Sequence, residues 1–445
     1  MEGAPPPRRR VVIIGGGFAG LEAARALRNA PADVVLVDRN NYHCFQPLLY
    51  QVATAALSPG EIAWPIRYLL RGQRNLTVYQ AEVHGIDREA RVVHAGAHAF
   101  AFDQLVIATG ATHSYFGHPE WAEHAPGLKR IEDATAIRRR VLCAFEAAEL
   151  APPEDQARLL TFIVVGGGPT GVEMAGAIAE MARLSLRRDF RRVDTTMARI
   201  ILIEAGPKIL AAFPDDLSAY ARRALAAQGV EVRLGAAVER CLPEGVLVGG
   251  ALIPASVTIW AAGVRASPAA AWLGAAADRA GRVTVEEDLS IAGDPDVFVV
   301  GDVAAVAGEN GRPVPGIAPA AKQMGRYVGR LIGDRIAGRP FAGPFRYRHQ
   351  GDLATIGRDA AVVSLGGWKL TGRLAWLFWS IAHVYFLIEA RSRLAVAVDW
   401  AWSYVTHRRG ARLIVGGAEG APAAPATAVT PPRPAAAAQE RALRV

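Results

Sequence analysis

Two glycine-rich segments have the spacing of a phosphate-binding turn. Residues 15–20 read GGGFAG and residues 166–171 read GGGPTG, and each segment follows a continuous run of apolar residues. Glycines at these positions permit a tight turn and a close approach of a pyrophosphate, which the N-terminus of the following helix faces with its N–H groups. One such loop is weak evidence, but two in matching settings predict two dinucleotide sites.

An acidic residue ends the second apolar run of each repeat. Asp38 follows residues 34–37, and Glu204 follows residues 200–203. A carboxylate at this place can accept hydrogen bonds from the ribose hydroxyl groups of an adenosine. Glu204 would also repel a 2′-phosphate and thereby favour NADH over NADPH, although Lys208 lies nearby in the sequence.

The elements that must position these loops are those of a doubly wound α/β sheet. Apolar residues with helical spacing predict one helix over 21–27 and a second over 171–181. The buried parallel strands expected around them occupy residues 11–14, 34–37, 105–108, 161–165, 200–203 and 297–300. Because the last strand would rejoin the first unit, the pattern predicts two Rossmann-like domains, one inserted in the other.

The C-terminal quarter has a different character. Residues 374–388 read LAWLFWSIAHVYFLI, which is apolar on nearly all sides but shorter than the roughly 20 residues of a spanning helix. Residues 394–405 add interfacial aromatic residues, and the flanking cations are Arg391, Arg393, Arg408, Arg409 and Arg412. We expect residues 374–412 to lie on a lipid bilayer surface, with a buried dimer interface as the alternative.

Composition and charge narrow the class of protein. The chain has 445 residues, 51% of them hydrophobic and 21% charged, which is typical of two or three globular domains. The net charge of +8 favours an anionic partner, but no nucleic-acid recognition module accompanies it, so no nucleic acid is expected. The three cysteines are Cys44, Cys143 and Cys241, whose spacing predicts neither disulfides nor a metal site. The N-terminus is not expected to be a signal peptide, because glycines interrupt its apolar run.

Several further segments carry a family resemblance. The sequence resembles the flavoproteins with two dinucleotide domains and, among them, the type II NADH dehydrogenases, which are single-chain NADH:quinone oxidoreductases. The match runs from about residue 10 to 412. It is carried by NNYHCFQPLLYQVA at 40–53, ATGA at 108–111, GGGPTGVE at 166–173, WAAGV at 260–264 and VGD at 300–302.

This resemblance implies FAD and NADH as cofactors, and it names the residues that hold them. The implied FAD residues are Gly15, Gly17, Phe18, Ala19, Gly20, Asp38, Arg39, Gln46, Val83, Thr109, Gly110, Gly301, Asp302 and Ala320. The implied NADH residues are Gly166, Gly168, Pro169, Thr170, Gly171, Glu204, Ala262 and Gly263. No resident metal is implied.

Two catalytic residues follow from the same resemblance. The quinone-side motif of the family places two glutamines around small residues, and residues 318–323 read APAAKQ, which keeps Gln323 but has Pro319 at the first position. Glu173 is implied to lie near nicotinamide and flavin, although the helix dipole alone would also favour an acid there. The protons for quinol formation could come from Glu173, His349 or water.

The resemblance also implies a domain division and an activity. The expected division is FAD-binding domain 1–115 and 271–335, connecting helical segment 116–159, NADH-binding domain 160–270, C-terminal membrane-associating and quinone-site region 336–416, and disordered tail 417–445. The expected enzyme passes hydride from NADH to FAD and electrons onward to a membrane quinone, without pumping protons. It is expected at the cytoplasmic face of the inner membrane as a peripheral protein, and a homodimer is compatible with the sequence.

Two alternatives stay open at this point. A thiol-flavin NADH oxidase or disulfide reductase would use a single reactive cysteine, and Cys44 lies at a suggestive position. A nucleotide-binding redox sensor would bind FAD but would need no membrane surface. The apolar, tryptophan-rich C-terminal segment favours the quinone reductase over the sensor.

Overall fold

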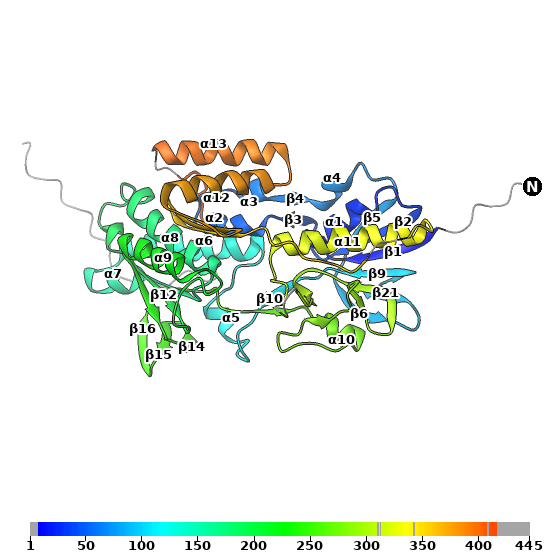
Figure 1. Ribbon diagram of the computed structural model, residues 1–445. Helices are drawn as coiled ribbons and strands as arrows, with labels where there is room; N and C mark the ends of the chain where they lie inside the picture. Colours follow the sequence, from blue (N-terminus) through cyan, green and yellow to red (C-terminus); the bar gives the residue numbers. More distant parts are fainter. Residues whose placement is uncertain (1–7, 309–310, 312, 341–342, 407–408, 416–445) are drawn as a thin grey trace, which may run out of the picture.

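The structure is a computed structural model that describes residues 8–308, 311, 313–340, 343–406 and 409–415. Two α/β units lie side by side, and a pair of C-terminal helices runs along one edge of the molecule (Figure 1). The tail predicted over 417–445 lies outside the described residues.

The first unit is built on a six-stranded sheet in the order β20-β21-β9-β1-β2-β5. Its strands are β1 (Arg9–Ile14), β2 (Ala32–Asp38), β5 (Leu76–Gln80), β9 (Gln104–Ile107), β20 (Ser290–Ile291) and β21 (Asp294–Val299). All neighbouring strands are parallel except β20 and β21. Val297 in β21 pairs with Leu105 in β9, so the chain returns to the first sheet after it has completed the second.

The second unit repeats the arrangement with four parallel strands in the order β13-β12-β11-β17. These strands are β11 (Thr161–Val165), β12 (Arg199–Glu204), β13 (Val230–Leu234) and β17 (Val257–Trp260). The side chains of β11 are buried along its whole length, as expected for a parallel strand covered by helices on both faces. The predicted fold class, with one dinucleotide domain inserted in another, is confirmed.

Short strands and loops complete the two units. The remaining strands outside the C-terminal region are β3 (Tyr42–Cys44), β4 (Ala63–Pro65), β6 (Val83–Asp87), β7 (Val92–Ala95), β8 (His98–Ala101), β10 (Ala111–His113), β14 (Val238–Leu242), β15 (Gly245–Val248), β16 (Ala251–Pro254), β18 (Val264–Ala266), β19 (Val283–Thr284) and β22 (Ala304–Ala305). β10 and β18 pair antiparallel, which joins the two units where the chain passes between them.

Helices cover the faces of the sheets, and two of them, α1 and α8, begin at the glycine loops. They are α1 (Phe18–Ala26), α2 (Leu49–Ala53), α3 (Pro59–Ile62), α4 (Ile66–Leu70), α5 (Trp121–His124), α6 (Ile131–Leu150), α7 (Pro153–Leu159), α8 (Pro169–Glu180), α9 (Asp215–Ala227), α10 (Ala269–Leu273) and α11 (Ala318–Ile336). Single turns of other helix types span Gln46–Leu48, Met181–Ser185, Thr195–Met197 and Gly301–Val303. α8 begins two residues before the predicted start, because proline suits the first turn of a helix.

The C-terminal region packs a three-stranded sheet and two helices against both units. Its elements are β23 (Asp352–Gly357), β24 (Ala360–Leu365), β25 (Trp368–Thr371), α12 (Gly372–Phe386) and α13 (Ala390–Thr406). α12 lies over the rest of the fold and α13 is the outermost layer (Figure 1). Within the described part of the chain, no helix combines the length and the apolar character that crossing a membrane requires.

One side of these two helices is apolar and exposed to solvent. We call it the apolar helical face, and it comprises Leu374, Leu377, Phe378, Ile381, Tyr385, Phe386, Leu394, Val398, Trp402 and Val405. Single exposed apolar residues are common on protein surfaces, but this face groups ten of them on two neighbouring helices. Contiguous apolar patches of this kind mark interaction surfaces. The opposite side of α12 is buried, with Trp379 only 2% exposed, so the helix is not apolar and free all round.

Candidate functional site

The first glycine loop has a geometry that only glycine permits. Gly15 has a φ of +101°, and a Cβ there would lie 2.5 Å from the carbonyl oxygen of Ala108. A Cβ on Gly20 would lie 1.8 Å from the carbonyl oxygen of Gly15, so α1 sits directly against the end of β1. The N-terminus of α1 is thereby fixed at the mouth of a cleft, where its N–H groups can face an anion.

Asp38 holds this loop and also faces the cleft. Its carboxylate accepts hydrogen bonds at 2.6 Å from the backbone N–H of Gly16 and at 2.6 Å from that of Asn40. Burial raises the pKa of Asp38, and the two backbone hydrogen bonds oppose that rise. A carboxylate positioned in this way at the end of β2 can accept a ribose hydroxyl group.

The cleft has a volume of about 890 Å³ and contains most of the predicted FAD residues. Those that line it are Gly15, Gly17, Phe18, Ala19, Asp38, Arg39, Gln46, Val83, Thr109, Gly110, Gly301 and Asp302. Gly20 and Ala320 are not in its wall: Gly20 packs beneath the loop, and Ala320 is 1% exposed within α11. These two residues shape the cleft from behind.

The polar groups on the far wall suit a flavin nucleotide. Asp302 follows β21 and lines the cleft, and no hydrogen bond from the described residues reaches its carboxyl group, whose pKa is raised by burial. Such a group can accept hydrogen bonds from sugar hydroxyls. Thr109 lies opposite, with its Oγ1 atom 2.5 Å from Oγ of Ser267. The glycine cradle and these polar groups therefore fit a bound FAD.

His43 is a cleft residue that the sequence analysis did not single out. Its Nδ1 atom lies 2.8 Å from the carbonyl oxygen of Gly16, and its ring packs edge-on against Phe18 at 5.0 Å. Burial lowers the pKa of His43 to about 4, so the ring is neutral and Nδ1 carries the hydrogen that Gly16 accepts. Its position inside the segment 40–53, which carries the family resemblance, is the signal that could have identified it.

The second glycine loop repeats this geometry atom by atom. Gly166 has a φ of +109°, and a Cβ there would lie 2.7 Å from the carbonyl oxygen of Ala261 and 2.7 Å from the N atom of Ala262. A Cβ on Gly171 would lie 1.8 Å from the carbonyl oxygen of Gly166. Gly168 caps α8, Pro169 and Thr170 form its first turn, and Gly263 follows β17 beside Ala262.

Glu204 plays the part in this loop that Asp38 plays in the first. Its carboxylate accepts hydrogen bonds of 2.6 Å from the N–H groups of both Gly167 and Gly206. Lys208 does not offset its charge, because the Lys208 ammonium donates to Asp215 at 2.7 Å and to the carbonyl oxygen of Phe213 at 3.0 Å. The local charge at the ribose position is therefore negative, which disfavours a 2′-phosphate.

Glu173 lies apart from the FAD cleft. It lines a small hollow of about 90 Å³ between α2, α8, β23, α12 and α13, whose walls include Tyr50, Trp379 and Trp400. Enclosure raises the pKa of Glu173 well above its ordinary value, against a hydrogen bond from the backbone of Thr355. This rise favours the protonated form of the carboxyl group, and the catalytic role of Glu173 stays a prediction.

Gln323 is held by the chain that crosses behind it. Its Nε2 atom donates to the carbonyl oxygen of Arg348 at 2.9 Å, and its Oε1 atom accepts from the N–H of Arg348 at 2.9 Å. These bonds use one N–H and the oxygen of the amide, and the predicted contact of Gln323 with quinone also stays a prediction. His349 is exposed beside Asp352, with a separation of 3.4 Å between Nε2 and Oδ2.

Cys44 lines the cleft but is not an activated thiol. Burial raises its pKa to about 12, and the charge of Glu132 acts in the same direction. A nucleophilic cysteine needs a lowered pKa and a nearby positive charge, because the thiolate is the reactive form. The surroundings of Cys44 therefore disfavour the thiol-flavin alternative.

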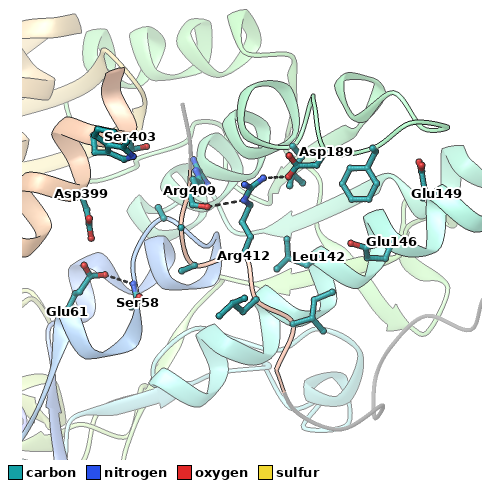
Figure 2. A pocket seen from close by; sticks show the side chains of 18 residues that line it. Ser58, Glu61, Leu142, Glu146, Glu149, Asp189, Asp399, Ser403, Arg409 and Arg412 are labelled. Atoms are coloured by element: carbon teal, nitrogen blue, oxygen red, sulfur yellow. Dashed lines mark hydrogen bonds and ion pairs between the residues drawn. The ribbon is translucent and has the colours of Figure 1, made fainter. Parts of the chain in front are cut away.

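A second hollow, of about 740 Å³, is lined by none of the glycine-loop residues (Figure 2). The carboxyl groups around it are Glu61, Glu146, Glu149, Asp189 and Asp399. Glu61 forms a hydrogen bond with Asp399, Glu149 accepts from the backbone of residues 191–193, and Asp189 pairs with Arg412. These groups connect α13 and the following chain to the rest of the fold, which favours a structural role.

One of the predicted membrane cations is buried beside this hollow. Arg409 is 5% exposed, donates to the carbonyl oxygens of Thr54 and Ala177, and pairs with Glu180 at 3.3 Å. The prediction that Arg409 faces lipid headgroups is wrong, because its guanidinium is buried and already binds Thr54, Ala177 and Glu180. Arg408 lies outside the described residues.

Comparison with known proteins gives the family. Residues 9–325 match the family described as pyridine nucleotide-disulphide oxidoreductase, and residues 349–409 match the NDH2 C-terminal domain. A type II NADH:quinone oxidoreductase of Mycobacterium tuberculosis is 44% identical over 412 residues, which are 89% of this chain and 88% of that protein. The chain belongs to the type II NADH:quinone oxidoreductases.

Less similar proteins also match this chain over most of its length. The type II NADH:quinone oxidoreductase of Staphylococcus haemolyticus is 31% identical over 81% of this chain and 90% of its own length. The structure of NDH2 from Plasmodium falciparum in complex with NADH superposes with a TM-score of 0.82 at 20% identity, covering 92% of this chain and 100% of that one. The fold of this type II oxidoreductase is therefore shared along nearly its whole length.

Proposed function

We propose that the chain oxidises NADH and reduces a membrane quinone, with FAD bound in the first cleft. The observation that carries this proposal is the repeated cradle, in which each glycine loop is held by its own carboxylate, Asp38 or Glu204. One chain thus offers sites for two dinucleotides. The relatives with which it shares 44% and 31% identity are named for this reaction.

The proposed work of the protein is binding and orientation. Bound FAD supplies the chemistry that accepts two electrons and passes them on. The loop at Gly15 and the N-terminus of α1 hold its pyrophosphate, Asp38 binds the adenosine ribose, and Asp302 binds sugar hydroxyls nearer the reacting ring. Glu204 binds the ribose of NADH and rejects NADPH through its negative charge.

The remaining proposed site residues act on the quinone side. Glu173 is a source of protons for quinol formation, because burial raises the pKa of its carboxyl group well above the ordinary value and favours the protonated form. Gln323 binds Arg348 through one N–H of its Nε2 atom and through its Oε1 atom, so the second N–H can donate to a quinone carbonyl group without loss of either bond.

We further propose that the apolar helical face attaches the enzyme to the cytoplasmic face of the membrane. Its apolar side chains suit the acyl region of a bilayer, and Arg373, Arg391 and Arg393 lie at the ends of the two helices where lipid headgroups would be. A lipid-soluble substrate favours this attachment. The family assignment supports a reaction that does not pump protons.

The direct test is NADH oxidation by the purified yellow protein, with and without a soluble ubiquinone or menaquinone analogue. We expect quinone-dependent turnover with NADH, weak turnover with NADPH, and full activity in a Cys44→Ser variant, because the Cys44 thiol is protonated. Oxygen- or disulfide-dependent turnover that the Cys44→Ser variant loses would instead support the thiol-flavin class. Vesicles loaded with a pH-sensitive dye should acidify no faster when NADH is supplied.

A further inference from the structure

Lys322 carries more unused hydrogen-bond donors than any other side chain of the segment 318–323. Pro319 has no donor, and the amide of Gln323 binds Arg348 through one N–H and its oxygen, which leaves it a single N–H. Within the part of the chain that the structure describes, no hydrogen bond or ion pair reaches the Lys322 ammonium. The segment that resembles a quinone motif therefore presents a free cation in place of a glutamine.

Two aromatic rings from different parts of the fold fix the position of this ammonium. Nζ of Lys322 lies 5.3 Å from the ring centroid of Phe18 and 5.3 Å from that of Phe386. Both distances are within the range of a cation–π interaction, which stabilises a cation without using its hydrogen-bond donors. The three N–H bonds thus stay available to a ligand.

The two rings also show what Lys322 connects. Phe18 begins α1 in the first glycine loop and lines the FAD cleft. Phe386 ends α12, is 43% exposed, and belongs to the apolar helical face. The Lys322 ammonium therefore lies between a residue of the FAD cleft and a residue of the apolar helical face.

The charges around Lys322 leave it without a counterion. The nearest acid to influence it, Glu22, already pairs with Arg326 at 2.7 Å and with Arg25 at 3.5 Å. Burial lowers the pKa of Lys322, and Arg25, Arg326 and Arg393 act in the same direction, whereas Glu22 opposes them. A partly buried cation with no acceptor is unfavourable, and an oxygen atom that carries negative charge would relieve it.

We propose that Lys322 donates a hydrogen bond to a carbonyl oxygen of the quinone and so replaces the glutamine that Pro319 displaces. This inference rests on the proposed quinone reduction. The ammonium keeps its proton throughout. It binds the substrate and stabilises the negative charge that builds up on that oxygen as electrons arrive, which is the effect expected of a fixed positive group beside a reacting oxygen.

The test compares two electron acceptors in the FAD-loaded enzyme. A short-chain benzoquinone needs the proposed pocket, whereas ferricyanide is a small hydrophilic acceptor with no carbonyl oxygen to bind. Lys322→Met should lower kcat/KM for the quinone by about ten- to a hundredfold, as expected for the loss of a hydrogen bond from a charged donor. Flavin content and the rate of ferricyanide reduction by NADH should stay within twofold of the wild type.

Three further variants separate a contact with substrate from a structural role. Lys322→Arg should retain most of the quinone activity, because it keeps a cationic donor, and Lys322→Gln should be intermediate. Arg330→Met removes an exposed positive charge about two turns along the same helix and should leave the quinone kinetics unchanged, since Arg330 is not among the charges that act on Lys322.

The outcomes are distinct. Quinone kcat/KM within twofold of wild type in Lys322→Met would overturn the proposal, and so would an equal loss of quinone and ferricyanide activity or of bound flavin in both Met and Gln variants. A wild-type enzyme that reduces ferricyanide but no quinone would overturn the proposed function itself, before any variant is compared.

Discussion

Asp38 and Glu204 each hold the loop that their proposed nucleotide would bind. The carboxylate of Asp38 accepts from Gly16, and that of Glu204 accepts from Gly167, each at 2.6 Å. The same oxygen atoms that shape the glycine turn can therefore be shared with ribose hydroxyl groups. Nucleotide affinity and loop geometry are coupled through a single side chain in each unit.

Replacing Glu204 should weaken NADH binding more than NADPH binding. In Glu204→Gln the charged acceptor for the ribose is lost, and so is the repulsion of a 2′-phosphate. We expect KM for NADH to rise about ten- to a hundredfold, because a hydrogen bond to a charged group contributes about 1.5–3 kcal/mol. Steady-state kinetics with both nucleotides measure the change in their ratio.

A second carboxylate in the same sheet provides the control. Glu231 in β13 pairs with Arg199 at 2.7 Å and has no place in the loop, so Glu231→Gln should leave both KM values unchanged. Equal KM values for NADH in the wild type and in Glu204→Gln would show that Glu204 serves the loop alone.

The sequence could predict the surroundings of the proposed ribose-binding carboxylates but not those of the proposed quinone-side residues. Asp38 and Glu204 follow directly from local order, because the end of a parallel strand beside a glycine loop has one place in the fold. The surroundings of Glu173 and Gln323 depend on residues far along the chain, because the backbone of Thr355 bonds to Glu173 and the backbone of Arg348 bonds to Gln323. No local sequence pattern shows which distant residues will lie beside a side chain. For the same reason Arg409 was predicted at the lipid surface although it is buried in the core.

At the scale of elements, the packing of α11 on α1 was not predicted from the sequence. A Cβ on Gly325 would lie 2.0 Å from the carbonyl oxygen of Ala19, and one on Gly329 would lie 2.6 Å from that of Ala23. The two helices therefore touch backbone to backbone, directly behind the loop that faces the FAD cleft. The glycines are visible in the sequence, but their partner helix lies about 300 residues away in the chain.

Gly325→Ala should move α1 and impair FAD binding. The new methyl group would meet backbone, which cannot rotate away, so we expect a loss of stability of about 1–3 kcal/mol or more and a lower flavin content. Gly333→Ala on the same helix is the matched control, because its Cβ would meet nothing closer than 3.7 Å. It should instead gain up to about 1 kcal/mol from helix propensity. Thermal unfolding and flavin absorbance measure both, and equal behaviour would contradict the packing argument.

A shared proton connects α13 to α3. Burial raises the pKa of Glu61 to about 7, and the hydrogen bond with Asp399 adds to the rise. Figure 2 shows these two residues next to each other at one side of the hollow. In the unfolded or undocked chain Glu61 would lose its proton near its ordinary pKa of 4.5. The packing of α13 on α3 therefore loses stability as the pH rises from about 4.5 to 7. Above pH 7 this contribution stays lost.

We expect hydrogen exchange in residues 390–406, corrected for its intrinsic pH dependence, to become faster between pH 5 and pH 8. Glu61→Gln keeps a donor for Asp399 but has no proton to lose, so it should remove most of this dependence. Glu146→Gln, in the wall of the same hollow, should leave the pH dependence as it is. Protection of α13 that is equal at both pH values in the wild type would refute the shared proton.

At the scale of the whole molecule, the sequence predicted the interleaving of the two units because each strand carries its own signal. The returning strand β21 is continuously apolar over its second half and pairs with β9 where a parallel partner was missing. The two C-terminal segments singled out in the sequence, residues 374–388 and 394–405, lie largely within α12 (Gly372–Phe386) and α13 (Ala390–Thr406). Their orientation was not predictable, because it depends on which side of each helix the earlier units cover.

That orientation decides what the enzyme can attach to. Leu377 and Ile381 are 52% and 62% exposed on the same side of α12, at the edge of the molecule formed by α12 and α13 (Figure 1). Leu377→Glu with Ile381→Glu should lower binding to phosphatidylglycerol vesicles at least about a hundredfold, because inserting each aliphatic side chain contributes about 1.5–3 kcal/mol. Co-sedimentation measures the binding, and NADH–ferricyanide activity should be unchanged.

The control is an exposed leucine on the opposite edge of the molecule. Leu252 in β16 is 43% exposed and lies far from α12 (Figure 1), so Leu252→Glu should bind vesicles like the wild type. Vesicle binding that survives the double variant, together with conversion from dimer to monomer in light scattering, would assign the apolar helical face to a second copy of the chain. Loss of vesicle binding with unchanged molecular mass would assign it to the lipid, and would explain why an exposed apolar face that includes Phe386 lies beside Lys322.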